Sequence, residues 1–456
     1  MPCHVPGLGE SVLCGSVERP LDAKAPTGRW ISVNFAVVPA KARARHADPV
    51  YFLAGGPGQS AIAILPIVLP NLRRLNNRRD LVFVDQRGTG TSAALRCPPE
   101  RALADTLDPA TLPARMQLCR RALERLPQGD LRQFTTAIAM ADLDAVREQL
   151  GHEQINLIGG SYGTRAALDY LRLHPQRVRR VVLDGVVPPD VALSHMLAAD
   201  AASALAALFA DCEADGECAR RHPRLRAHWE SLFADLPRSL VLANPLTGRK
   251  ESVTLSEGAI TALVRPPLYS PALAAALPQA IDDAAAGDWN GLVGLASAVA
   301  GRPGLGIDLG MHFAVVCAED AGIAGEGGTT GRFSHGLADA YAEVCRDWPT
   351  GEVDAEFRRL SPSPVPVLLL SGGLDPATPP RHAERVAAAL GTKTRHIVVA
   401  HAGHGIMAIG CAGDLVFQFV DAVDEQQALA IDAACLADIP RPPAFVPSRI
   451  RQEARQ

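Results

Sequence analysis

The chain has 456 residues, of which 48% are hydrophobic and 21% are charged, and its formal net charge is −4. This length exceeds the size at which one hydrophobic core usually stops growing, so we expect one large domain with a sizeable insertion, or two domains. The basic residues are scattered along the sequence, which argues against a nucleic-acid partner. The sequence contains no run of about 18 uninterrupted apolar residues, and it therefore predicts no membrane span.

Short apolar segments alternate with helical patterns over the first part of the chain. The expected strands are Trp30–Val38, Val50–Ala54, Leu81–Asp85, Ile155–Ile158 and Val178–Asp184, and the expected helices are Ala61–Arg74 and Thr136–Leu150. All of these strands except the first are continuous apolar runs, which is typical of strands covered on both faces. The pattern therefore predicts an α/β fold with a mostly parallel, doubly wound sheet.

The sequence pattern changes between residues 188 and 347, where Ala and Leu recur at helical spacing. Helical stretches are expected at Met196–Ala210, Gly258–Val264, Pro271–Ala285 and Trp289–Ala300, with one hairpin at Leu240–Leu255. Such a segment cannot continue a parallel sheet, so we interpret it as a helical cap inserted after the sixth strand. An independent helical domain without catalytic relevance is the alternative.

The sheet pattern then resumes. The expected elements are a strand at Val365–Leu370, a helix at Pro379–Leu390, a strand at Thr394–Val399 and a helix at about Asp414–Val423. The expected organisation is a core over residues 1–187 and 348–456, interrupted by the cap at 188–347. From Arg441 onward the chain is rich in Pro and Arg, and we expect it to lie on the surface or to fray.

Ten cysteines require a choice between metal binding, free thiols and disulfides. No C-x-x-C motif and no matching pair of histidines is present, which argues against structural zinc. Pairing between near neighbours closes the shortest loops. It gives Cys3 with Cys14, Cys97 with Cys119, Cys212 with Cys218, Cys317 with Cys345, and Cys411 with Cys435. Ten separate buried thiols are the alternative, but half of these cysteines lie in polar or turn-like surroundings.

Disulfides imply an oxidising compartment, which is the periplasm or the outside of the cell. The first residues show no basic segment followed by an apolar core, so they contain no signal peptide. We therefore expect that a leader was removed and that Met1 was supplied for expression.

The segment Gly159–Gly163, with the sequence Gly-Gly-Ser-Tyr-Gly, follows an expected buried strand and precedes a helical pattern. Glycines at both ends of this G-x-S-x-G motif let strand and helix approach closely, so that Ser161 lies on a strained turn with its hydroxyl exposed. This is the setting of a nucleophilic serine. A structural glycine turn is the alternative.

A serine nucleophile needs a base and an orienting carboxylate. Asp375 and His404 follow the last two expected strands, and ligands of parallel sheets meet the loops at such carboxyl ends. The order Ser161, Asp375, His404 is that of the α/β-hydrolases, so the sequence predicts this triad and the α/β-hydrolase fold. Asp184 is a competing acid and His401 a competing base. We prefer Asp375 because the Pro-Pro after Asp184 indicates a chain leaving the sheet.

The tetrahedral intermediate of acyl transfer needs backbone donors for its oxyanion. One expected donor is the amide of Tyr162, directly after the nucleophile. The other is expected in the glycine-rich segment 55–58, which directly follows the expected strand Val50–Ala54. We assign this second donor to the amide of Gly56. An ordinary glycine turn is again the alternative.

Three motifs in order carry a family resemblance. They are Gly-Gly-Pro-Gly at 55–58, Asp-Gln-Arg-Gly-Thr-Gly-Thr-Ser at 85–92 and Gly-Gly-Ser-Tyr-Gly-Thr at 159–164. Together they resemble the proline iminopeptidase family of serine peptidases, and the long cap and the cysteines are similar to its secreted branch with the tripeptidyl aminopeptidases. The resemblance runs from about Cys14 to about Cys435. One departure is Ala54, where many relatives carry histidine.

This resemblance implies cleavage near a free peptide N-terminus, which requires a carboxylate for the ammonium group and a cap that blocks longer chains. Glu319 and Asp320 follow a cysteine in the cap, and the secreted branch has a similar acidic motif at its site. They are the expected amine-binding residues, and a solvated helix end is the alternative. Asp85 and Arg87 are expected to form a buried ion pair that supports the oxyanion loop.

The sequence thus predicts a serine aminopeptidase that needs no metal and no cofactor and acts on peptides. A carboxylesterase or amidase for small esters or amides is the competing enzyme, because the same triad serves esters. A non-catalytic binding module on a hydrolase scaffold is a further alternative. The pattern does not determine the oligomeric state, and we favour a monomer slightly.

Overall fold

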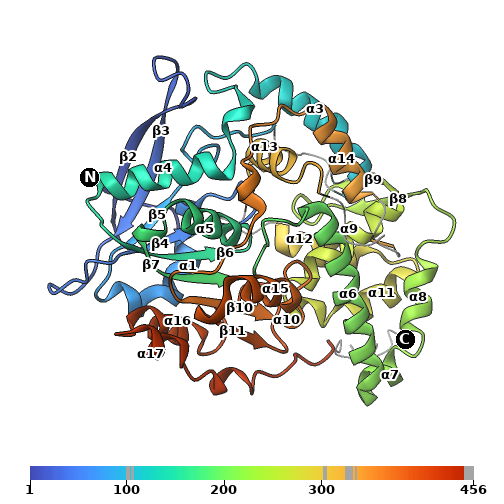
Figure 1. The fold of residues 1–456 in the computed structure, drawn as a ribbon. Coiled ribbons are helices and arrows are strands. Elements are labelled where there is room, and N and C mark those ends of the chain that lie inside the picture. Colours follow the sequence, from blue (N-terminus) through green and yellow to red (C-terminus); the bar gives the residue numbers. More distant parts are fainter. Residues whose placement is uncertain (99–102, 104–106, 301–305, 324–331, 334–335, 446–456) are drawn as a thin grey trace.

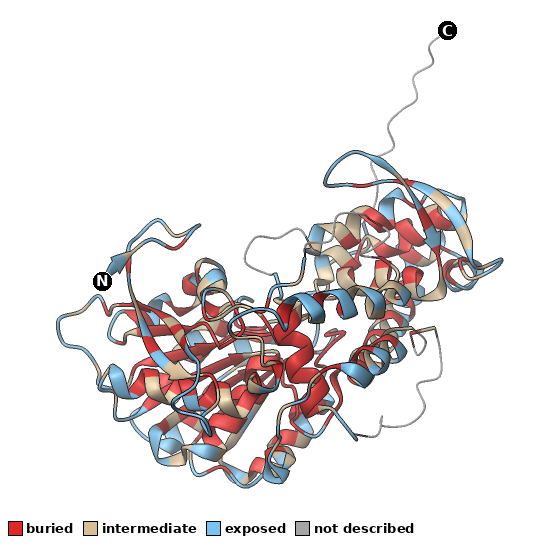
Figure 2. Cartoon of the chain, turned by 90° about the horizontal axis from the view of Figure 1, so that it is seen from above, coloured by how far each residue is buried: buried red, intermediate tan, exposed pale blue. Residues whose placement is uncertain are grey.

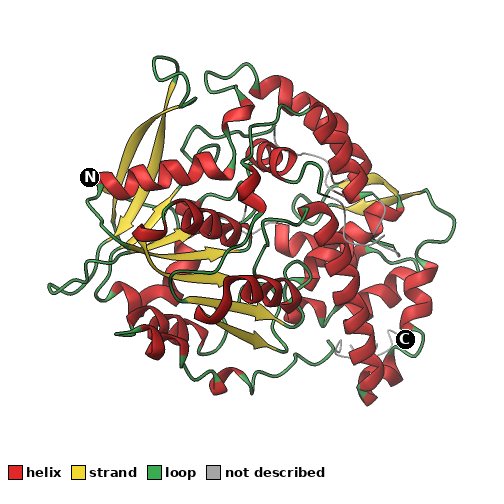
Figure 3. Cartoon of the chain, in the orientation of Figure 1, coloured by secondary structure: helices red, strands yellow, loops and turns green. Residues whose placement is uncertain are grey.

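A nine-stranded sheet forms the centre of the protein, with helices on both faces and a further group of helices beside it (Figure 1, Figure 3). The computed structural model describes residues 1–98, 103, 107–300, 306–323, 332–333 and 336–445. The strands of the sheet are β1 (Pro2–Cys3), β2 (Val12–Pro20), β3 (Trp30–Val38), β4 (Val50–Leu53), β5 (Leu81–Val84), β6 (Ile155–Gly160), β7 (Val178–Asp184), β10 (Val367–Gly372) and β11 (Thr394–Val399).

The strand order is β1-β2-β3-β5-β4-β6-β7-β10-β11. Pairing is antiparallel from β1 to β5 and parallel from β5 through β11, so the predicted mostly parallel sheet is confirmed. Strand β2 was not expected from its pattern, because its apolar residues are separated by Gly15, Ser16 and charged side chains. Its long antiparallel pairing with β3 stabilises it instead.

The helices on the two faces cover different side chains of the same strands. Helices α1 (Ala61–Asn76), α16 (Ala412–Asp421) and α17 (Glu425–Leu429) lie on one face, and α3 (Leu112–Leu123), α4 (Thr136–Gln149), α5 (Tyr162–Leu173) and α15 (Pro380–Leu390) contribute to the other. Phe52 and Phe83 belong to the cluster with α1, whereas Tyr51 and Val82 belong to the cluster with α5. This alternation follows from the two-residue period of a strand. It explains why the central strands are apolar throughout.

The helical segment follows β7, which is the sixth strand when the two-residue β1 is left out. It contains α6 (Leu193–Ala214), α7 (Gly216–Arg221), α8 (Leu225–Ser231), β8 (Arg238–Ala243), β9 (Lys250–Leu255), α9 (Glu257–Leu268), α10 (Pro271–Ala274), α11 (Leu277–Ala285), α12 (Asn290–Ala300), α13 (Leu309–Glu319) and α14 (Leu337–Asp347). Strands β8 and β9 form the predicted hairpin. Figure 2 shows buried residues concentrated around the sheet and again within this helical group.

Two helices of the predicted cap range pack against the sheet domain. Met311 and Phe313 of α13 and Val344 of α14 belong to the same hydrophobic cluster as α4 and α5. The cluster of the cap itself is built mainly from the helices α6 to α12. The C-terminal segment also reaches the cap, because Arg441 pairs with Asp211 of α6 and the N–H group of Phe445 donates to the carbonyl of Ala275 at 2.8 Å.

Helix α6 has the length and hydropathy of a membrane span, with a mean hydropathy of 1.4 over its most apolar window. Within the part of the chain that the structure describes, it is the one helix that meets this test. Since 56% of that window is buried inside the protein, its apolar character is explained by packing between helices.

All five disulfides join near neighbours in the sequence. The pairs are Cys3–Cys14, Cys97–Cys119, Cys212–Cys218, Cys317–Cys345 and Cys411–Cys435. The predicted connectivity is therefore confirmed, and no cysteine is left free among the described residues. Each bridge closes a loop of 6 to 28 residues, so the bridges fix local segments of the chain.

Candidate active site

Ser161 lies between β6 and α5 in a backbone conformation that is rare for a residue with a side chain, with φ 54° and ψ −125°. The flanking glycines make this turn possible. A Cβ atom at Gly159 would collide with the backbone of Gly163, and one at Gly163 would collide with the carbonyl of Leu53. The turn has the features of a nucleophile elbow, in which strain keeps the serine hydroxyl exposed above the sheet.

Asp375 and His404 are joined directly, although they come from different loops. Nδ1 of His404 lies 2.8 Å from Oδ2 of Asp375, and the Thr378 hydroxyl donates to the same oxygen at 2.6 Å. The other carboxylate oxygen accepts the N–H groups of Ala377 and Thr378. Because the carboxylate accepts, Nδ1 carries the proton, and Nε2 keeps a lone pair for a hydroxyl proton.

Burial and charge act in opposite directions on this pair. Burial disfavours the charged imidazole, but the charge and hydrogen bond of Asp375 outweigh it and raise the pKa of His404 above its ordinary value. Burial likewise acts to raise the pKa of Asp375, and His404 and Thr378 together bring it below its ordinary value. Both shifts favour an ionised Asp375 that supports a protonated His404.

The segment Asp184–Gly185 after β7 borders both the serine and the histidine. The Ser161 N–H donates to the carbonyl of Asp184 at 2.9 Å, and a Cβ at Gly185 would lie 3.1 Å from Cε1 of His404. The carboxylate of Asp184 accepts the N–H groups of Ile406 and Met407, both at 2.8 Å. Asp184 therefore holds the histidine loop in place, and in this arrangement Asp375 is the acid bonded to the imidazole.

His401, the competing base, points elsewhere. It is exposed, and its Nδ1 bonds to the carbonyl of Ile439 near the C-terminus at 3.0 Å. The structure thus favours His404, as the sequence predicts.

The glycine loop after β4 lies against the serine. A Cβ at Gly55 would come within 3.1 Å of Cβ of Ser161, so only glycine lets the loop approach this closely. Gly56 follows with φ 109°, a conformation in which a side chain is strained. Tyr162 is the first residue of α5, where N–H groups have no partner within the helix. The residues predicted as oxyanion donors therefore lie close to Ser161, because Tyr162 follows it in the chain and Gly56 follows Gly55.

Helix α13 supports the far side of this loop. The N–H group of Asp308 donates to the carbonyl of Gly58 at 2.8 Å, and Nδ1 of His312 lies 3.1 Å from the carbonyl oxygen of Pro57. Because a carbonyl only accepts, Nδ1 is the donor, and Nε2 accepts the hydroxyl proton of Tyr341 at 2.8 Å. Burial lowers the pKa of His312 to about 4, so this imidazole stays neutral. It acts as a support for the loop and not as a second base.

The expectation that Glu319 and Asp320 are free to bind an amine does not fit this structure. Glu319 is 1% exposed, and its Oε1 accepts the N–H group of Thr136 at 2.7 Å. Asp320 forms an ion pair with Arg165 at 3.0 Å and accepts the N–H group of Leu193 at 2.7 Å. Both carboxylates are therefore engaged, Glu319 with the first residue of α4 and Asp320 with Arg165 of α5 and the first residue of α6. The alternative of a solvated helix end is wrong, because the side chain of Glu319 is 1% exposed and that of Asp320 is 8% exposed.

One oxygen of the Glu319 carboxyl group lacks a hydrogen bond. Its Oε2 is buried without a hydrogen-bond partner and lies 3.8 Å from the Arg165 guanidinium. Burial raises the pKa of Glu319 to about 7, and the charge of Arg165 opposes this rise. The carboxyl thus changes charge near neutral pH.

The predicted ion pair between Asp85 and Arg87 is absent, although both side chains are buried. Arg87 pairs instead with Asp142 of α4, with contacts of 2.6 and 2.8 Å. Asp85 accepts the Ser60 hydroxyl at 2.6 Å and thereby braces the start of α1. The two side chains do not meet because they reach opposite faces of the sheet, Asp85 at the start of α1 and Arg87 at α4.

Two residues near the triad were missed by the sequence analysis. Thr378 bonds the acid, and its place three residues after Asp375 in a Pro-containing turn could have indicated it. Tyr269 follows α9 in the cap and packs its ring edge against His404, with ring centroids 5.2 Å apart. The backbone carbonyl of Tyr269 also accepts the backbone N–H group of His404 at 3.0 Å. No local pattern signals such a contact between distant parts of the chain.

A metal site is not indicated. Over the residues that the structure describes, no three His, Cys, Asp or Glu side chains gather closely enough to hold an ion.

Comparison with known proteins gives two family matches and several relatives. The alpha/beta hydrolase fold model matches residues 48–212, and the TAP-like protein model matches residues 331–428. Serine protease Hip1 of Mycobacterium tuberculosis is 31% identical over 206 residues, which is 41% of this chain and 37% of that protein. The tripeptidyl aminopeptidase of Streptomyces lividans is 32% identical over 198 residues. This match covers 40% of this chain and 37% of the length of the aminopeptidase.

Proline iminopeptidase of Neisseria meningitidis is 30% identical over 140 residues, covering 30% of this chain and 32% of that protein. The matches thus span only about a third of the length of these relatives. The two family models, in contrast, cover more than half of the chain, one on each side of the cap. The chain therefore belongs to the α/β-hydrolase family of serine peptidases that includes the proline iminopeptidases and the tripeptidyl aminopeptidases.

Proposed function

We propose that this protein is a serine aminopeptidase, which hydrolyses peptides near a free N-terminus through Ser161, His404 and Asp375. The observation that carries the proposal is the bonded pair of Asp375 and His404 next to a strained serine turn. Such strain is costly and persists where the surrounding structure enforces it, which is common at active sites. Relatives named as serine protease and tripeptidyl aminopeptidase support peptide bonds as the substrate class.

In the first half of the reaction Nε2 of His404 takes the Ser161 hydroxyl proton while the serine oxygen attacks the scissile carbonyl carbon. The protonated imidazole then gives this proton to the leaving amine, the C–N bond breaks, and an acyl-enzyme remains. In the second half His404 takes a proton from water, the hydroxide attacks the ester, and the proton returns to Ser161. Asp375 stabilises the imidazolium in both halves, in agreement with the raised pKa of His404.

The amides of Gly56 and Tyr162 are the proposed donors to the oxyanion. Each such donor typically contributes roughly 10²- to 10³-fold to the rate. Contacts from Asp308 and His312 hold the glycine loop, so the hole is formed before substrate arrives.

A carboxylesterase or amidase is the second candidate, and the engaged state of Glu319 and Asp320 favours keeping it. An aminopeptidase needs an acid that is free for the ammonium group, and these two carboxylates are occupied.

The depth of the cap decides whether one residue or three leave per cut. The five disulfides support folding in the periplasm or outside the cell.

The two candidates are separated by blocked substrates. The substrates are the p-nitroanilides of Pro, Ala and Ala-Pro-Ala, each with a free and with an acetylated N-terminus. An aminopeptidase should cleave the free forms at least about tenfold faster, because acetylation removes the ammonium group and with it a desolvated ion pair. Mass spectrometry of a short unblocked peptide then shows whether one or three residues are released. Equal rates for free and acetylated substrates, or faster turnover of small esters only, would overturn the aminopeptidase in favour of the esterase or amidase.

A further inference from the structure

Gln59 directly follows the glycine-rich oxyanion loop at residues 55–58 and bonds back to the first residue of that loop. The N–H group of Gly55 donates to Oε1 of Gln59 at 3.2 Å. The carbonyl of Gly55 accepts the backbone N–H group of Gln59 at 3.3 Å. Gln59 therefore holds Gly55 through both of its backbone hydrogen-bonding groups.

This pair of contacts orients the peptide group that carries the N–H group of Gly56. The peptide bond between Gly55 and Gly56 is trans and planar, so its carbonyl and its N–H group point in opposite directions. Because the Gly55 carbonyl faces the backbone of Gln59, the Gly56 N–H group is directed away from it. Gly56 is partly exposed, and no acceptor for its N–H group lies among the described residues. The donor is thus oriented and remains available to a ligand.

The Gln59 carboxamide lies close to the serine turn. A Cβ atom placed on Gly55 would be 3.1 Å from Cβ of Ser161 and 3.5 Å from Oε1 of Gln59. Because a backbone N–H group can only donate, the oxygen of the carboxamide faces Gly55. Nε2 of the half-buried Gln59 has no hydrogen-bond partner within the part of the chain that the structure describes. The side chain thus has one group that the loop engages and one that is free.

The backbone of Gln59 is held from two sides. The next residue, Ser60, caps α1 and donates its hydroxyl proton to Asp85 at 2.6 Å. On the other side Gln59 pairs with Ile307, just before α13, in an isolated antiparallel bridge. A side chain on a backbone fixed in this way can hold a neighbouring peptide group at a small further cost in conformational entropy.

We propose that Gln59 is a positioning residue of the oxyanion hole, which holds the Gly55–Gly56 peptide group so that the Gly56 N–H group is aimed at the developing oxyanion. This inference deepens the proposed hydrolase function and rests on it. A donor that is oriented before the reaction stabilises the transition state more than the bound substrate. The contribution of Gln59 should therefore appear in kcat and not in KM.

The free NH2 group of Gln59 offers a competing explanation, in which it donates to a substrate carbonyl other than the reacting one. The two roles differ in their dependence on the substrate. Positioning acts on the reacting carbonyl and affects every substrate, including p-nitrophenyl acetate, which has a single carbonyl group. A direct contact would act mainly on KM, and only for substrates that carry a further carbonyl.

The test compares wild type with Gln59→Met, which keeps the length of the side chain and removes the carboxamide. The substrates are p-nitrophenyl acetate and the p-nitroanilide of Ala-Pro-Ala, with Ser161→Ala as the blank for uncatalysed hydrolysis. We expect kcat of Gln59→Met to fall by about 10- to 100-fold for both substrates, with KM within about threefold of wild type. Labelling by a fluorophosphonate should slow by about tenfold or more, because its phosphoryl oxygen occupies the same hole.

Gln117→Met, at an exposed glutamine of α3, is the matched control and should behave as wild type. Melting temperatures show whether each variant is folded. Gln59→Asn keeps a carboxamide but shortens its reach by one methylene group. It should lose kcat in the same way, and it replaces Gln59→Met if that variant does not fold.

The outcomes separate this proposal from the proposed function. Unchanged kcat and labelling in Gln59→Met overturn the positioning role and leave the hydrolase intact. A loss confined to the peptide substrate, or to KM, assigns the NH2 group to a substrate carbonyl and also overturns the positioning role. A loss with the acetate ester and the probe, in a protein that cleaves no peptide, supports positioning and overturns the aminopeptidase. Wild type that neither hydrolyses a substrate nor takes up the probe overturns both.

Discussion

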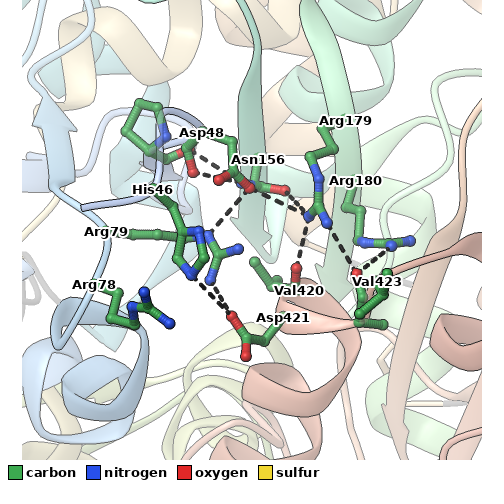
Figure 4. Close-up of polar contacts among 12 residues, drawn as sticks. His46, Asp48, Arg78, Arg79, Asn156, Arg179, Arg180, Val420, Asp421 and Val423 are labelled. Carbon is green, nitrogen blue, oxygen red and sulfur yellow. Dashed lines mark hydrogen bonds and ion pairs between the residues drawn. The ribbon is translucent and has the colours of Figure 1, made fainter. Parts of the chain in front are cut away.

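The two edges of the parallel sheet carry polar clusters of similar residue types but opposite character. At the carboxyl ends of the strands lie the serine turn, the Asp375–His404 pair and the glycine loop. At the amino ends of β4, β5, β6 and β7 lies a network of arginines and aspartates, shown in Figure 4. The first cluster contains a strained backbone and a bonded acid–base pair. In the second, arginines are shared between aspartates and carbonyl groups, although Nε of Arg180 is buried there without a hydrogen-bond partner.

The network at the amino ends joins several elements around one buried side chain. Arg79 is 3% exposed and contacts Asp48 at 3.1 Å and Asp421 of α16 at 2.6 Å (Figure 4). Arg179 reaches Asp48 at 3.2 Å and the carbonyl of Val420 at 2.7 Å. These contacts tie the loop before β4, the start of β7 and the end of α16 together.

The carboxyl edge, where we propose the reaction, differs in the geometry of its groups. Ser161 has a strained backbone, the pKa of His404 is raised, and Oε2 of Glu319 is buried without a hydrogen bond. The comparison teaches that a strained backbone beside a bonded acid–base pair marks the edge where we propose the chemistry, whereas arginines shared between aspartates of different elements mark the edge that joins these elements. Substitutions at the two edges should therefore separate activity from stability.

The largest effect is expected at the carboxyl edge. Ser161→Ala removes the attacking oxygen and should lower kcat by about 10⁵-fold or more, as for other serine nucleophiles. The unfolding free energy should change by less than about 1 kcal/mol, because the side chain makes no structural hydrogen bond to the protein core. Activity assays and urea denaturation measure both. Ser203→Ala, on the cap helix α6, is the control and should leave the rate unchanged.

Asp375→Asn should have the next largest effect. The amide can present its N–H group to Nδ1 of His404 and favour the wrong tautomer, which lowers kcat by roughly 10³- to 10⁴-fold. The protein should stay folded, as judged by its melting temperature. Retention of more than about a tenth of the activity would mean that another acid, with Asp184 the nearest competitor, orients the imidazole.

At the amino edge the effect should move to stability. Arg79→Met leaves Asp48 and Asp421 without their shared cation and should cost about 3 kcal/mol of unfolding free energy. The value of kcat should stay within about twofold of wild type. Arg78→Met, at the exposed neighbour, is the control and should cost less than about 0.5 kcal/mol. A loss of kcat as large as that of Ser161→Ala or Asp375→Asn would contradict the assignment of stability to the amino edge and of activity to the carboxyl edge.

Glu319→Gln tests the unsatisfied carboxyl by its pH dependence. The folded-state pKa of about 7 lies above the ordinary 4.5, so the folded protein holds the proton more tightly than the unfolded chain. Its contribution to stability is full below pH 4.5 and is lost as the pH rises through about 7. Relative to wild type, the variant should therefore gain ~2 kcal/mol in unfolding free energy between pH 5 and pH 8. A constant difference across this range would contradict the raised pKa.

The smallest effect concerns the acid limb of the rate profile. His404 must be neutral to accept a proton, and its pKa lies above the ordinary 6.5. The kcat/KM of wild type should therefore fall as the pH drops through a midpoint above 6.5. In Asp375→Asn the supporting charge is lost and the midpoint should move to lower pH. An unmoved midpoint would assign the limb to a group other than His404.

Local patterns predicted much of the fold and of the site. The serine turn, the glycine loop and the disulfide pairs each depend on residues close in sequence, so spacing alone indicated them. Spacing alone did not indicate the partners of Arg87 and Glu319. These partners depend on the face of the sheet or helix toward which each side chain points. The contacts of Tyr269 with His404 depend on how the cap helices pack on the core, and no sequence period encodes that.

The central claim is that Ser161 is a nucleophile activated by His404. A fluorophosphonate probe tests it directly, because the attacking oxygen displaces fluoride and leaves a stable adduct that intact mass and peptide mapping detect. The account predicts one adduct on Ser161, none in Ser161→Ala and strongly slowed labelling in His404→Ala. Folded protein that takes up no probe, or an adduct that persists in Ser161→Ala, would contradict it.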